Sequence, residues 1–253
     1  SPTTLFAVYN INTYNITYVL NGGTATGNPS TYTIESQDIV INNPSKTGYT
    51  FTGWKEGTGE LQNPYIIRQG TTGDKTLTAN YTPIEYRITY DYNGGSLEEG
   101  KTNPDKYTIE SDRIVINNPS KTGYTFVGWN DGTSTVNPYV INTGSTGSRT
   151  LTAVYEVNTY NITYVLNGGT VTGNPSTYTI ESPDITINNP SKTGYTFTGW
   201  KEGTGELQKP YIIKQGTTGD KTLIANYTPI EYEITYEYNG GSLDQGKTNP
   251  DTT

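Results

Sequence analysis

The stretch PSKTGYTFTGW, at residues 44–54, is the part of the sequence that decides the fold. It returns as PSKTGYTFVGW at residues 119–129 and unchanged at residues 190–200. Together the copies hold all three tryptophans and three of the four phenylalanines of the chain. A phrase that gathers large rings in this way is either a displayed binding motif or the centre of a repeated module. Its recurrence at long intervals indicates a tandem array.

Other short phrases recur around it in the same order. Ile-Thr-Tyr followed by Asn-Gly-Gly opens each unit, TIES precedes the aromatic phrase, and a phrase of the form Thr-Leu-x-Ala-x-Tyr closes the unit. Trp54 and Trp200 stand 200 − 54 = 146 positions apart, and at that offset the chain nearly copies itself. The middle unit differs more, so the pattern predicts an alternation of two repeat types, A-B-A.

These landmarks divide the chain into five segments. We expect a preceding truncated repeat to contribute its last strand at the start, and a further truncated type B repeat to begin at the end. The predicted boundaries are residues 1–12 for the first fragment, 13–84 for repeat 1 (type A), 85–157 for repeat 2 (type B), 158–230 for repeat 3 (type A) and 231–253 for the last fragment.

Composition predicts small β-rich modules rather than one large core. Hydrophobic residues make up 31% of the 253 residues, against about 45–50% apolar residues in typical globular proteins. The 23 tyrosines, 29 glycines and 14 prolines indicate strands separated by turns. No segment has a convincing helical period. We therefore predict a mainly β fold, with at most one short helical turn per unit.

Alternation along the strands assigns their faces. Ile16, Tyr18 and Leu20 share one side of the opening strand, and the closing strand at residues 76–81 places Leu, Ala and Tyr inward in the same way. Within the aromatic phrase, Gly53 is expected to form a bulge that redirects Trp54.

The rings of the phrase have two interpretations. They could form an exposed platform for sugars, or they could fill the core of a module that has neither disulfide nor metal to stabilise it. The second interpretation is favoured because large aromatic side chains bury about 150–250 Å² each. The predicted core residues are Tyr49, Phe51, Trp54, Tyr124, Phe126, Trp129, Tyr195, Phe197 and Trp200.

Missing residue types exclude several kinds of chemistry. The chain contains no Cys, His or Met, so it has no disulfide, thiolate nucleophile, imidazole base or common zinc site. A net charge of −8 argues against a nucleic-acid partner, and no apolar run reaches the length of a membrane span. We expect no enzyme activity, no cofactor, no metal and no membrane insertion in this segment.

Carboxylates and lysines remain as candidate groups. Carboxylate pairs could resemble those of glycosidases, but solvated turn residues are the simpler interpretation. Calcium could bind an isolated aspartate, although no EF-hand type ladder exists. Lysines of the aromatic phrase could form isopeptide bonds with asparagine, or could simply cover apolar surface with their stems. The residues concerned are Glu35/Asp38, Glu110/Asp112 and Glu181/Asp184 as pairs, Asp74 and Asp131 for calcium, Lys46, Lys121 and Lys192 as lysines, and Asn80 and Asn226 as amides.

The ordered set of phrases resembles the Listeria–Bacteroides repeat family, whose members include the B-repeats of listerial internalin. The phrases that carry the resemblance are ITY, NGG, then P-x-x-x-G-Y-x-F-x-G-W, then T-L-x-A-x-Y. They cover each unit almost from end to end. The resemblance implies small β-grasp-like modules strung along bacterial surface proteins, between an adhesive region and a cell-wall anchor.

The connections between units predict restricted hinges. Ile84, Tyr86 and Ile88 continue the alternation across the first connection, which lacks the Gly/Ser composition of a flexible linker. We expect modules packed end to end as an elongated rod, whose partners are the neighbouring repeats and other copies in a filament or bundle. The predicted role is a non-catalytic stalk of a long repetitive bacterial protein that is extracellular and either cell-wall-anchored or filamentous. The alternative is an adhesive module that binds host glycan or protein.

Overall fold

The structure, a computed structural model, describes residues 2–252 and is all-β over that range. No helix occurs within it, so the short helical turn that the sequence allowed for each unit is absent from the described residues. The chain folds as three successive groups of strands, one for each of the repeats 1–3 defined above.

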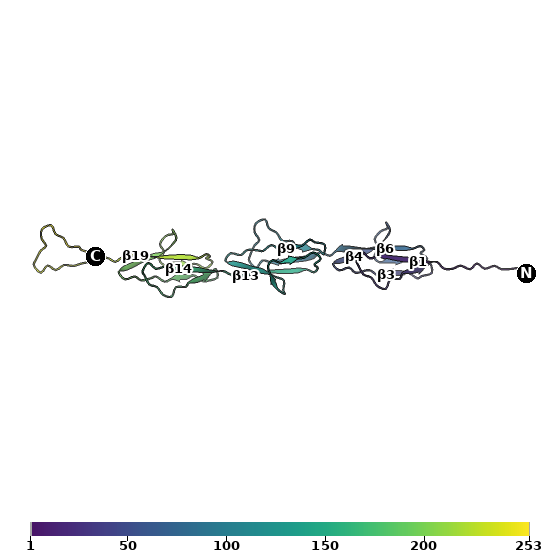
Figure 1. The fold of residues 1–253 in the computed structure, drawn as a ribbon, viewed down its shortest axis with the longest axis horizontal. Coiled ribbons are helices and arrows are strands. Elements are labelled where there is room, and N and C mark those ends of the chain that lie inside the picture. Colours follow the sequence, from purple (N-terminus) through teal and green to yellow (C-terminus); the bar gives the residue numbers. More distant parts are fainter. Residues whose placement is uncertain (1, 253) are drawn as a thin grey trace. The chain divides into compact units, whose positions relative to one another are not determined.

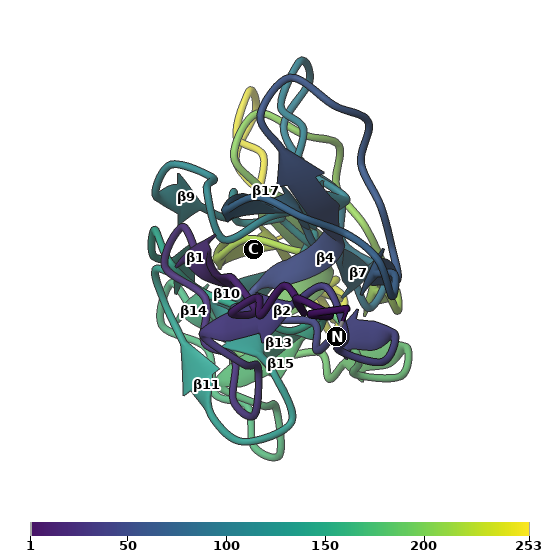
Figure 2. The same ribbon diagram turned by 90° about the vertical axis from the view of Figure 1, so that its right-hand side faces the viewer.

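Repeat 1 builds one mixed sheet and one separate antiparallel pair of short strands. Four strands follow the order β2-β1-β6-β4, and β3 pairs with β5. The opening and closing strands, β1 and β6, run parallel to each other, whereas the remaining pairs are antiparallel. Figures 1 and 2 show β1 and β4 within this group. The strands are β1 (Thr13–Val19), β2 (Thr31–Thr33), β3 (Ile39–Ile41), β4 (Tyr49–Glu56), β5 (Tyr65–Ile67) and β6 (Lys75–Pro83).

Repeat 3 has the same plan as repeat 1, and repeat 2 adds one short strand. The sheet orders are β11-β10-β13-β7-β8 in repeat 2 and β15-β14-β19-β17 in repeat 3, with the pairs β12-β9 and β16-β18. The strands of repeat 2 are β7 (Tyr86–Asp91), β8 (Lys106–Tyr107), β9 (Ile114–Val115), β10 (Tyr124–Asn130), β11 (Thr135–Val136), β12 (Val140–Ile141) and β13 (Arg149–Val157). Those of repeat 3 are β14 (Thr159–Val165), β15 (Thr177–Thr179), β16 (Ile185–Ile187), β17 (Tyr195–Glu202), β18 (Tyr211–Ile213) and β19 (Lys221–Pro229).

The contacts divide the chain into two units, and the division falls inside repeat 2. One unit contains the residues up to Pro119 together with Val127–Val154. The other contains Ser120–Phe126 together with the residues from Tyr155 onward. The turn at Ser120–Phe126 therefore groups with repeat 3 rather than with most of its own repeat.

Alternation of inward and outward residues builds the core of repeat 1. Ile16 on β1 and Leu77 and Ala79 on β6 are buried, as their strand parity predicts, and Val19 between the inward positions is exposed. The parallel pairing of β1 with β6 brings these residues onto one face of the sheet. The buried cluster is completed by Tyr32, Ile41, Trp54, Tyr65 and Ile67.

A bulge in β4 redirects the chain beside Trp54, as the sequence predicts. The pairing of β4 with β6 shifts register between Phe51 and Gly53, and Gly53 has φ +155°. A Cβ on Gly53 would stand 3.1 Å from the carbonyl oxygen of Gln62. The backbone of Trp54 exchanges two hydrogen bonds with Gln62 directly after the bulge. Glycine is needed here because both the backbone angle and the close neighbour disfavour a side chain.

The Asn-Gly turn after β1 is fastened to the closing strand. Asn21 has φ +49° and Gly22 has φ +84°, the left-handed conformation that these residue types tolerate. The Nδ2 of Asn21 donates a hydrogen bond of 2.9 Å to the carbonyl oxygen of Ala79. The same bond joins Asn167 to Ala225 in repeat 3. The recurring Asn-Gly-Gly phrase thus closes a turn and joins two strands.

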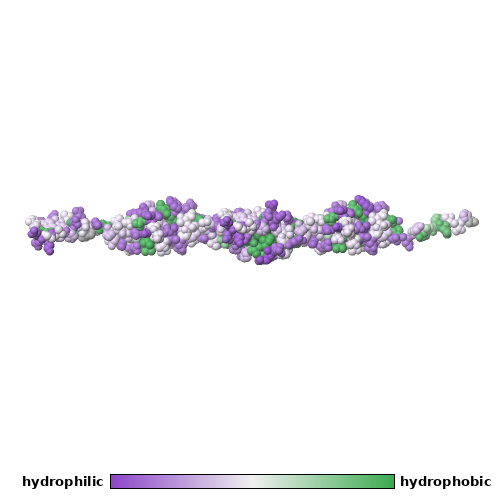
Figure 3. Space-filling model, turned by 90° about the horizontal axis from the view of Figure 1, so that it is seen from above, coloured by the Kyte–Doolittle hydropathy of each residue, from purple (hydrophilic) through white to green (hydrophobic). Residues whose placement is uncertain are grey.

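Residues 2–12 form no strand in this structure. Their sequence matches a closing strand, but Leu5 is 91% exposed where its counterpart Leu151 is buried. Figure 3 shows this extended segment with apolar areas on its surface. A closing strand needs an opening strand as its parallel partner, and this segment has none among the described residues.

Candidate functional site

The aromatic phrase divides between the core and the surface. Trp54, Trp129 and Trp200 are each 0% exposed, Phe197 is buried, and Phe51 and Phe126 are partly buried. The tyrosines lie further out: Tyr49 and Tyr124 are partly exposed, and Tyr195, expected in the core, is 39% exposed. The register shift after the phenylalanine separates the two ends of the phrase, so the tryptophan turns inward and the tyrosine stays at the end of the strand.

The tryptophans are packed by other rings. Tyr18 and Phe51 approach Trp54 edge-on, with ring centroids 5.7 Å and 5.6 Å away. In repeat 3, Tyr164 and Phe197 approach Trp200 in the same way, each at 5.6 Å. A sugar stacks on an exposed ring face, and these tryptophans expose none. They fill the core and do not form a platform.

The lysine of the phrase lies over tyrosine rings. The Nζ of Lys46 is 4.1 Å from the ring centroid of Tyr49 and 5.2 Å from that of Tyr81, which are distances typical of cation–π contacts. Lys121 and Lys192 repeat this arrangement. The amide of Asn80, considered for a crosslink, donates instead to the carbonyl oxygen of Thr78. Likewise, Asn226 donates to the carbonyl oxygen of Ile224.

The carboxylate pairs separate into two kinds of contact. Asp38 accepts hydrogen bonds from the backbone N–H of Gln69 (2.9 Å) and from Arg68 (2.6 Å), and these bonds lower the pKa of Asp38. Asp184 is held in the same way by Lys214 and Gln215, which lower its pKa. The glutamates of the second and third pairs instead contact tyrosines of the preceding repeat, as described below. In the third pair, Glu181 and Asp184 therefore bind different parts of the structure.

The aspartates considered for calcium accept hydrogen bonds from backbone groups of the protein. The Oδ1 of Asp74 accepts the backbone N–H of Asn15 at 2.7 Å. Asp131 accepts the side chain and backbone N–H of Thr133 and the backbone N–H of Ser134, and these bonds lower the pKa of Asp131 to about 2. Over residues 2–252, no three acidic side chains gather in a way that could hold a metal ion.

A charged cluster that the sequence did not reveal supports the sheets of repeats 1 and 3. Glu56 accepts hydrogen bonds from Lys75 (2.9 Å) and from the hydroxyl of Tyr65 (2.5 Å). Burial raises the pKa of Glu56, but these two bonds outweigh that effect and lower it. The same three residue types meet in repeat 3 as Glu202, Lys221 and Tyr211.

The corresponding positions of repeat 2 exchange both charged residues. Asp131, Arg149 and Tyr139 stand there, and the hydroxyl of Tyr139 lies 3.4 Å from Asp131 Oδ2. Repeat 2 thus has the shorter acidic side chain, Asp131, together with the longer basic side chain, Arg149. This coordinated change between repeat types is the signal in the sequence that could have revealed the cluster.

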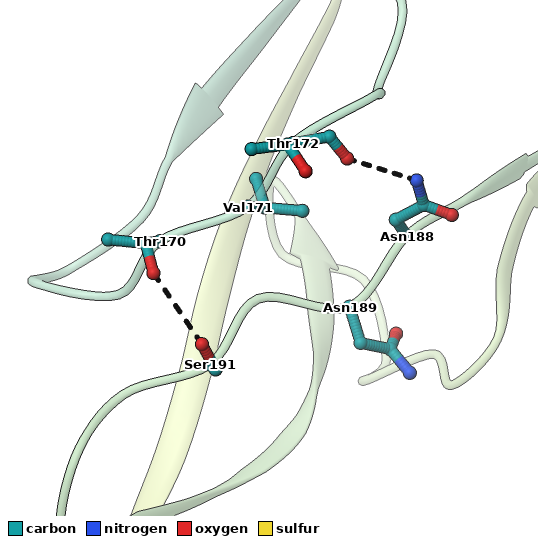
Figure 4. A pocket seen from close by; sticks show the side chains of 6 residues that line it. All are labelled: Thr170, Val171, Thr172, Asn188, Asn189 and Ser191. Atoms are coloured by element: carbon teal, nitrogen blue, oxygen red, sulfur yellow. Dashed lines mark hydrogen bonds between the residues drawn. The ribbon is translucent and has the colours of Figure 1, made fainter.

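A shallow polar groove lies on repeat 3. Its volume is about 380 Å³, and two segments of chain form its sides (Figure 4). Asn188 Nδ2 donates to the carbonyl oxygen of Thr172 at 3.1 Å, and the hydroxyls of Thr170 and Ser191 lie 3.5 Å apart. Several of its polar groups therefore bond to each other. The lining residues are Thr170, Val171, Thr172, Asn188, Asn189 and Ser191.

A side-chain hydrogen bond joins repeat 1 to repeat 2. Beside it, the backbone N–H of Ile84, the last residue of repeat 1, donates to the carbonyl oxygen of Gly48 in the same repeat at 2.9 Å. The hydroxyl of Tyr49 donates to Glu110 Oε1 at 2.8 Å, and this bond raises the pKa of Tyr49. The tyrosine assigned to the core from sequence thus contacts the TIES phrase of the next repeat.

Repeat 2 meets repeat 3 through the same pair of phrases. The backbone N–H of Asn158 donates to the carbonyl oxygen of Gly123 at 2.9 Å. The hydroxyl of Tyr124 donates to Glu181 Oε1 at 2.6 Å, and this bond raises the pKa of Tyr124. Each joint therefore has one tyrosine–glutamate bond between repeats, beside a backbone hydrogen bond from the connecting residue to the Gly-Tyr turn.

The sequence model of the Listeria-Bacteroides repeat domain matches residues 14–80, 86–154 and 160–226. Each match runs from the opening strand of a repeat to its closing strand. The chain belongs to the Listeria-Bacteroides repeat family. The resemblance carried by the recurring phrases is thereby confirmed.

Relatives of these Listeria-Bacteroides repeats occur in longer proteins. A protein of Evansella cellulosilytica described as a Gly-rich membrane protein is 29% identical over 248 residues, which are 94% of this chain and 28% of that protein. Another from the same organism, described as a membrane protein, is 24% identical over 252 residues, covering 96% of this chain and 36% of its own length. Internalin H of Listeria monocytogenes is 37% identical over 89 residues, 35% of this chain and 15% of internalin H. The chain thus spans about a third or less of the length of these relatives.

Within residues 2–252, no helix is long and apolar enough to cross a membrane.

Proposed function

We propose that this array is a non-catalytic spacer: a stalk segment of a long repetitive protein on a bacterial cell surface, which holds a terminal functional domain away from the cell. The observation that carries the proposal is the construction of the joints. Only Ile84 and Glu85 separate β6 from β7, and only Asn158 separates β13 from β14. Such short connections, each flanked by a tyrosine–glutamate hydrogen bond between repeats, restrict hinge motion.

The use of the polar residues supports the same role. The carboxylates Asp38, Asp74, Asp131 and Glu56 all accept hydrogen bonds that hold turns or strands of their own repeat. Side chains committed to such contacts stabilise a module. This is the pattern expected when the repeated unit is selected for its own stability.

An extracellular, surface location is part of the proposal. Its support is the membership of the Listeria-Bacteroides repeat family and the similarity to internalin H and to two proteins described as membrane proteins. We also propose that each repeat is β-grasp-like. The parallel pairing of its first and last strands at the centre of a mixed sheet supports this assignment.

Small-angle X-ray scattering of the full chain tests the stalk. We expect a stiff rod, whose longest dimension is close to the sum of three repeats placed end to end. Scattering from a compact particle, or from a freely jointed chain of three beads, would contradict the proposal.

A display experiment tests the biological role. An epitope tag placed before the array on a bacterial surface should become more accessible to antibody as repeats are added. Replacing the array with an unrelated rigid spacer of equal length should preserve that accessibility and the activity of any domain displayed beyond it. Loss of cell or glycan binding on this replacement would instead favour the adhesive alternative.

A further inference from the structure

At the joint between repeats 1 and 2, and at that between repeats 2 and 3, an isoleucine packs against a glycine beside the hydrogen bonds described above. The Gly-Tyr turn of one repeat (Gly48–Tyr49, Gly123–Tyr124) faces the Ile-Glu turn of the next (Ile109–Glu110, Ile180–Glu181). A Cβ on Gly48 would stand 2.6 Å from Cδ1 of Ile109, and one on Gly123 would stand 2.7 Å from Cδ1 of Ile180. The isoleucine therefore packs against a surface that only glycine provides.

Repeat 3 presents the same Gly-Tyr turn without this neighbour. Its phrase is identical to that of repeat 1, and Gly194 has the same φ of +78° as Gly48. A Cβ on Gly194 would meet nothing within 4 Å among the described residues. Tyr195 is 39% exposed, whereas Tyr49 is partly buried.

Repeat 1 presents the complementary half. Its Ile-Glu turn is Ile34–Glu35, and Ile34 is 46% exposed, whereas Ile109 and Ile180 are partly buried in their joints. Because the three phrases are identical in sequence, the difference in exposure of their isoleucines reflects the surface that docking covers. The Gly-Tyr turn of repeat 3 also keeps its conformation without a neighbour, since the backbone N–H of Ile230 donates to the carbonyl oxygen of Gly194.

We propose that the Gly-Tyr turn is a preformed docking surface whose partner is the Ile-Glu turn of the following repeat, and that the open copy at Gly194–Tyr195 accepts the Ile-Glu turn of a further repeat. Recognition combines an apolar contact of isoleucine on glycine with a charge-assisted hydrogen bond from tyrosine to glutamate. The inference deepens the stalk proposal by naming the partner of each repeat, and it rests on that proposal for its biological meaning.

A matched pair of variants in the full chain tests the docking. Gly48→Ala and Gly194→Ala place alanine in the same left-handed turn, so they share the same backbone strain. Only Gly48→Ala forces a methyl group against Ile109. We expect Gly48→Ala to speed amide hydrogen exchange of Ser111, which closes the Ile-Glu turn of repeat 2, by about tenfold, and Gly194→Ala to leave it unchanged. Equal exchange of Ser111 in the two variants would overturn the proposal.

A second, milder pair of variants tests the docking if Gly48→Ala unfolds repeat 1. Tyr49→Phe and Tyr195→Phe each remove one hydroxyl, and only that of Tyr49 bonds to Glu110. Exchange at Ser111 should accelerate in Tyr49→Phe alone. If the two phenylalanine variants behave alike, the tyrosine–glutamate bond contributes nothing to docking.

An extended chain tests the open surface. Residues 231–253 are replaced with a copy of residues 85–157, which places an Ile-Glu turn after repeat 3. Nitration of Tyr195 should slow by about tenfold, and Gly194→Ala in the same extended chain should restore its rate. Unchanged nitration of Tyr195 would overturn the assignment of this surface. Hydrogen exchange of Ser111 and nitration of Tyr195 report on single turns, whereas scattering reports on the whole chain. The docking proposal can therefore fail while scattering still shows a stiff rod, and it can be supported while scattering shows a flexible chain.

Discussion

Individual residues of the aromatic phrase do different work although they are neighbours in sequence. Trp54 anchors the core, Gly53 allows the bend beside it, and Tyr49 reaches the next repeat. The strand alternation that correctly placed Ile16 and Leu77 could not predict this division. The alternation of residues along a strand predicts the face of the sheet on which each side chain lies. It does not predict where along the strand the packed layer that covers this face ends.

Removing a core tryptophan should unfold its repeat. Trp54→Ala leaves a large cavity among Tyr18, Phe51 and Leu77, and such truncations cost about 3–5 kcal/mol, a large share of the stability of a module of this size. We expect one melting transition to move to a much lower temperature in calorimetry.

Leu61→Ala serves as the control for this prediction, because Leu61 is half exposed. That variant should melt like the parent chain. A Trp54→Ala chain that also melts like the parent would contradict the assignment of this ring to the core.

The pairing of strands depends on residues that are far apart in the sequence, and local patterns do not predict it. Turn residues and alternation located β1, β6 and the bulge of β4, because these features depend on nearby residues. The parallel pairing of β1 with β6 joins residues some sixty positions apart, such as Ile16 and Lys75. Local periodicity has no information on such partners. The cluster of Glu56, Lys75 and Tyr65 was missed for the same reason, since three different strands supply it.

Replacing the charged residues of repeat 1 with those of repeat 2 should reveal energetic coupling within the cluster of Glu56, Lys75 and Tyr65. Glu56→Asp shortens the acid and Lys75→Arg lengthens the base, so each single variant should lose about 0.5–1 kcal/mol of unfolding free energy after allowance for partial solvent exposure. The double variant reproduces the pair Asp131 and Arg149 of repeat 2 and should recover part of the loss.

Denaturant titration of the two single variants and the double variant measures this coupling. The exposed pair of Arg68 with Asp38 provides a control cycle, in which we expect little coupling. Strict additivity at Glu56 and Lys75 would show that the two residues do not interact.

The whole molecule is unusually rich in buried or half-buried phenols, so it should be sensitive to alkali. Burial raises the pKa of Tyr18 and raises that of Tyr164 to about 12. An unfolded chain ionises its tyrosines near pH 10. A raised pKa in the folded state means that the associated stability is fully present below about pH 10 and is lost as pH rises toward about 12.

Tyrosinate absorbance and circular dichroism, followed together on the full chain, test this expectation. Ionisation of the buried tyrosines and loss of β signal should coincide in a cooperative transition between about pH 10 and 12. A smooth ionisation of all tyrosines near pH 10, with the β signal unchanged, would contradict it.

The parallel arrangement of β1 and β6 has a mechanical consequence. In each repeat the chain enters at the start of the first strand and leaves at the end of the last, and these two strands lie side by side in the same direction. Tension applied through the chain therefore pulls the neighbours past each other along their length. All ladder hydrogen bonds between Ile16–Val19 and Lys75–Thr78 then carry load together, instead of opening one by one. A repeat built in this way resists shear, and rupture requires the whole ladder to fail at once.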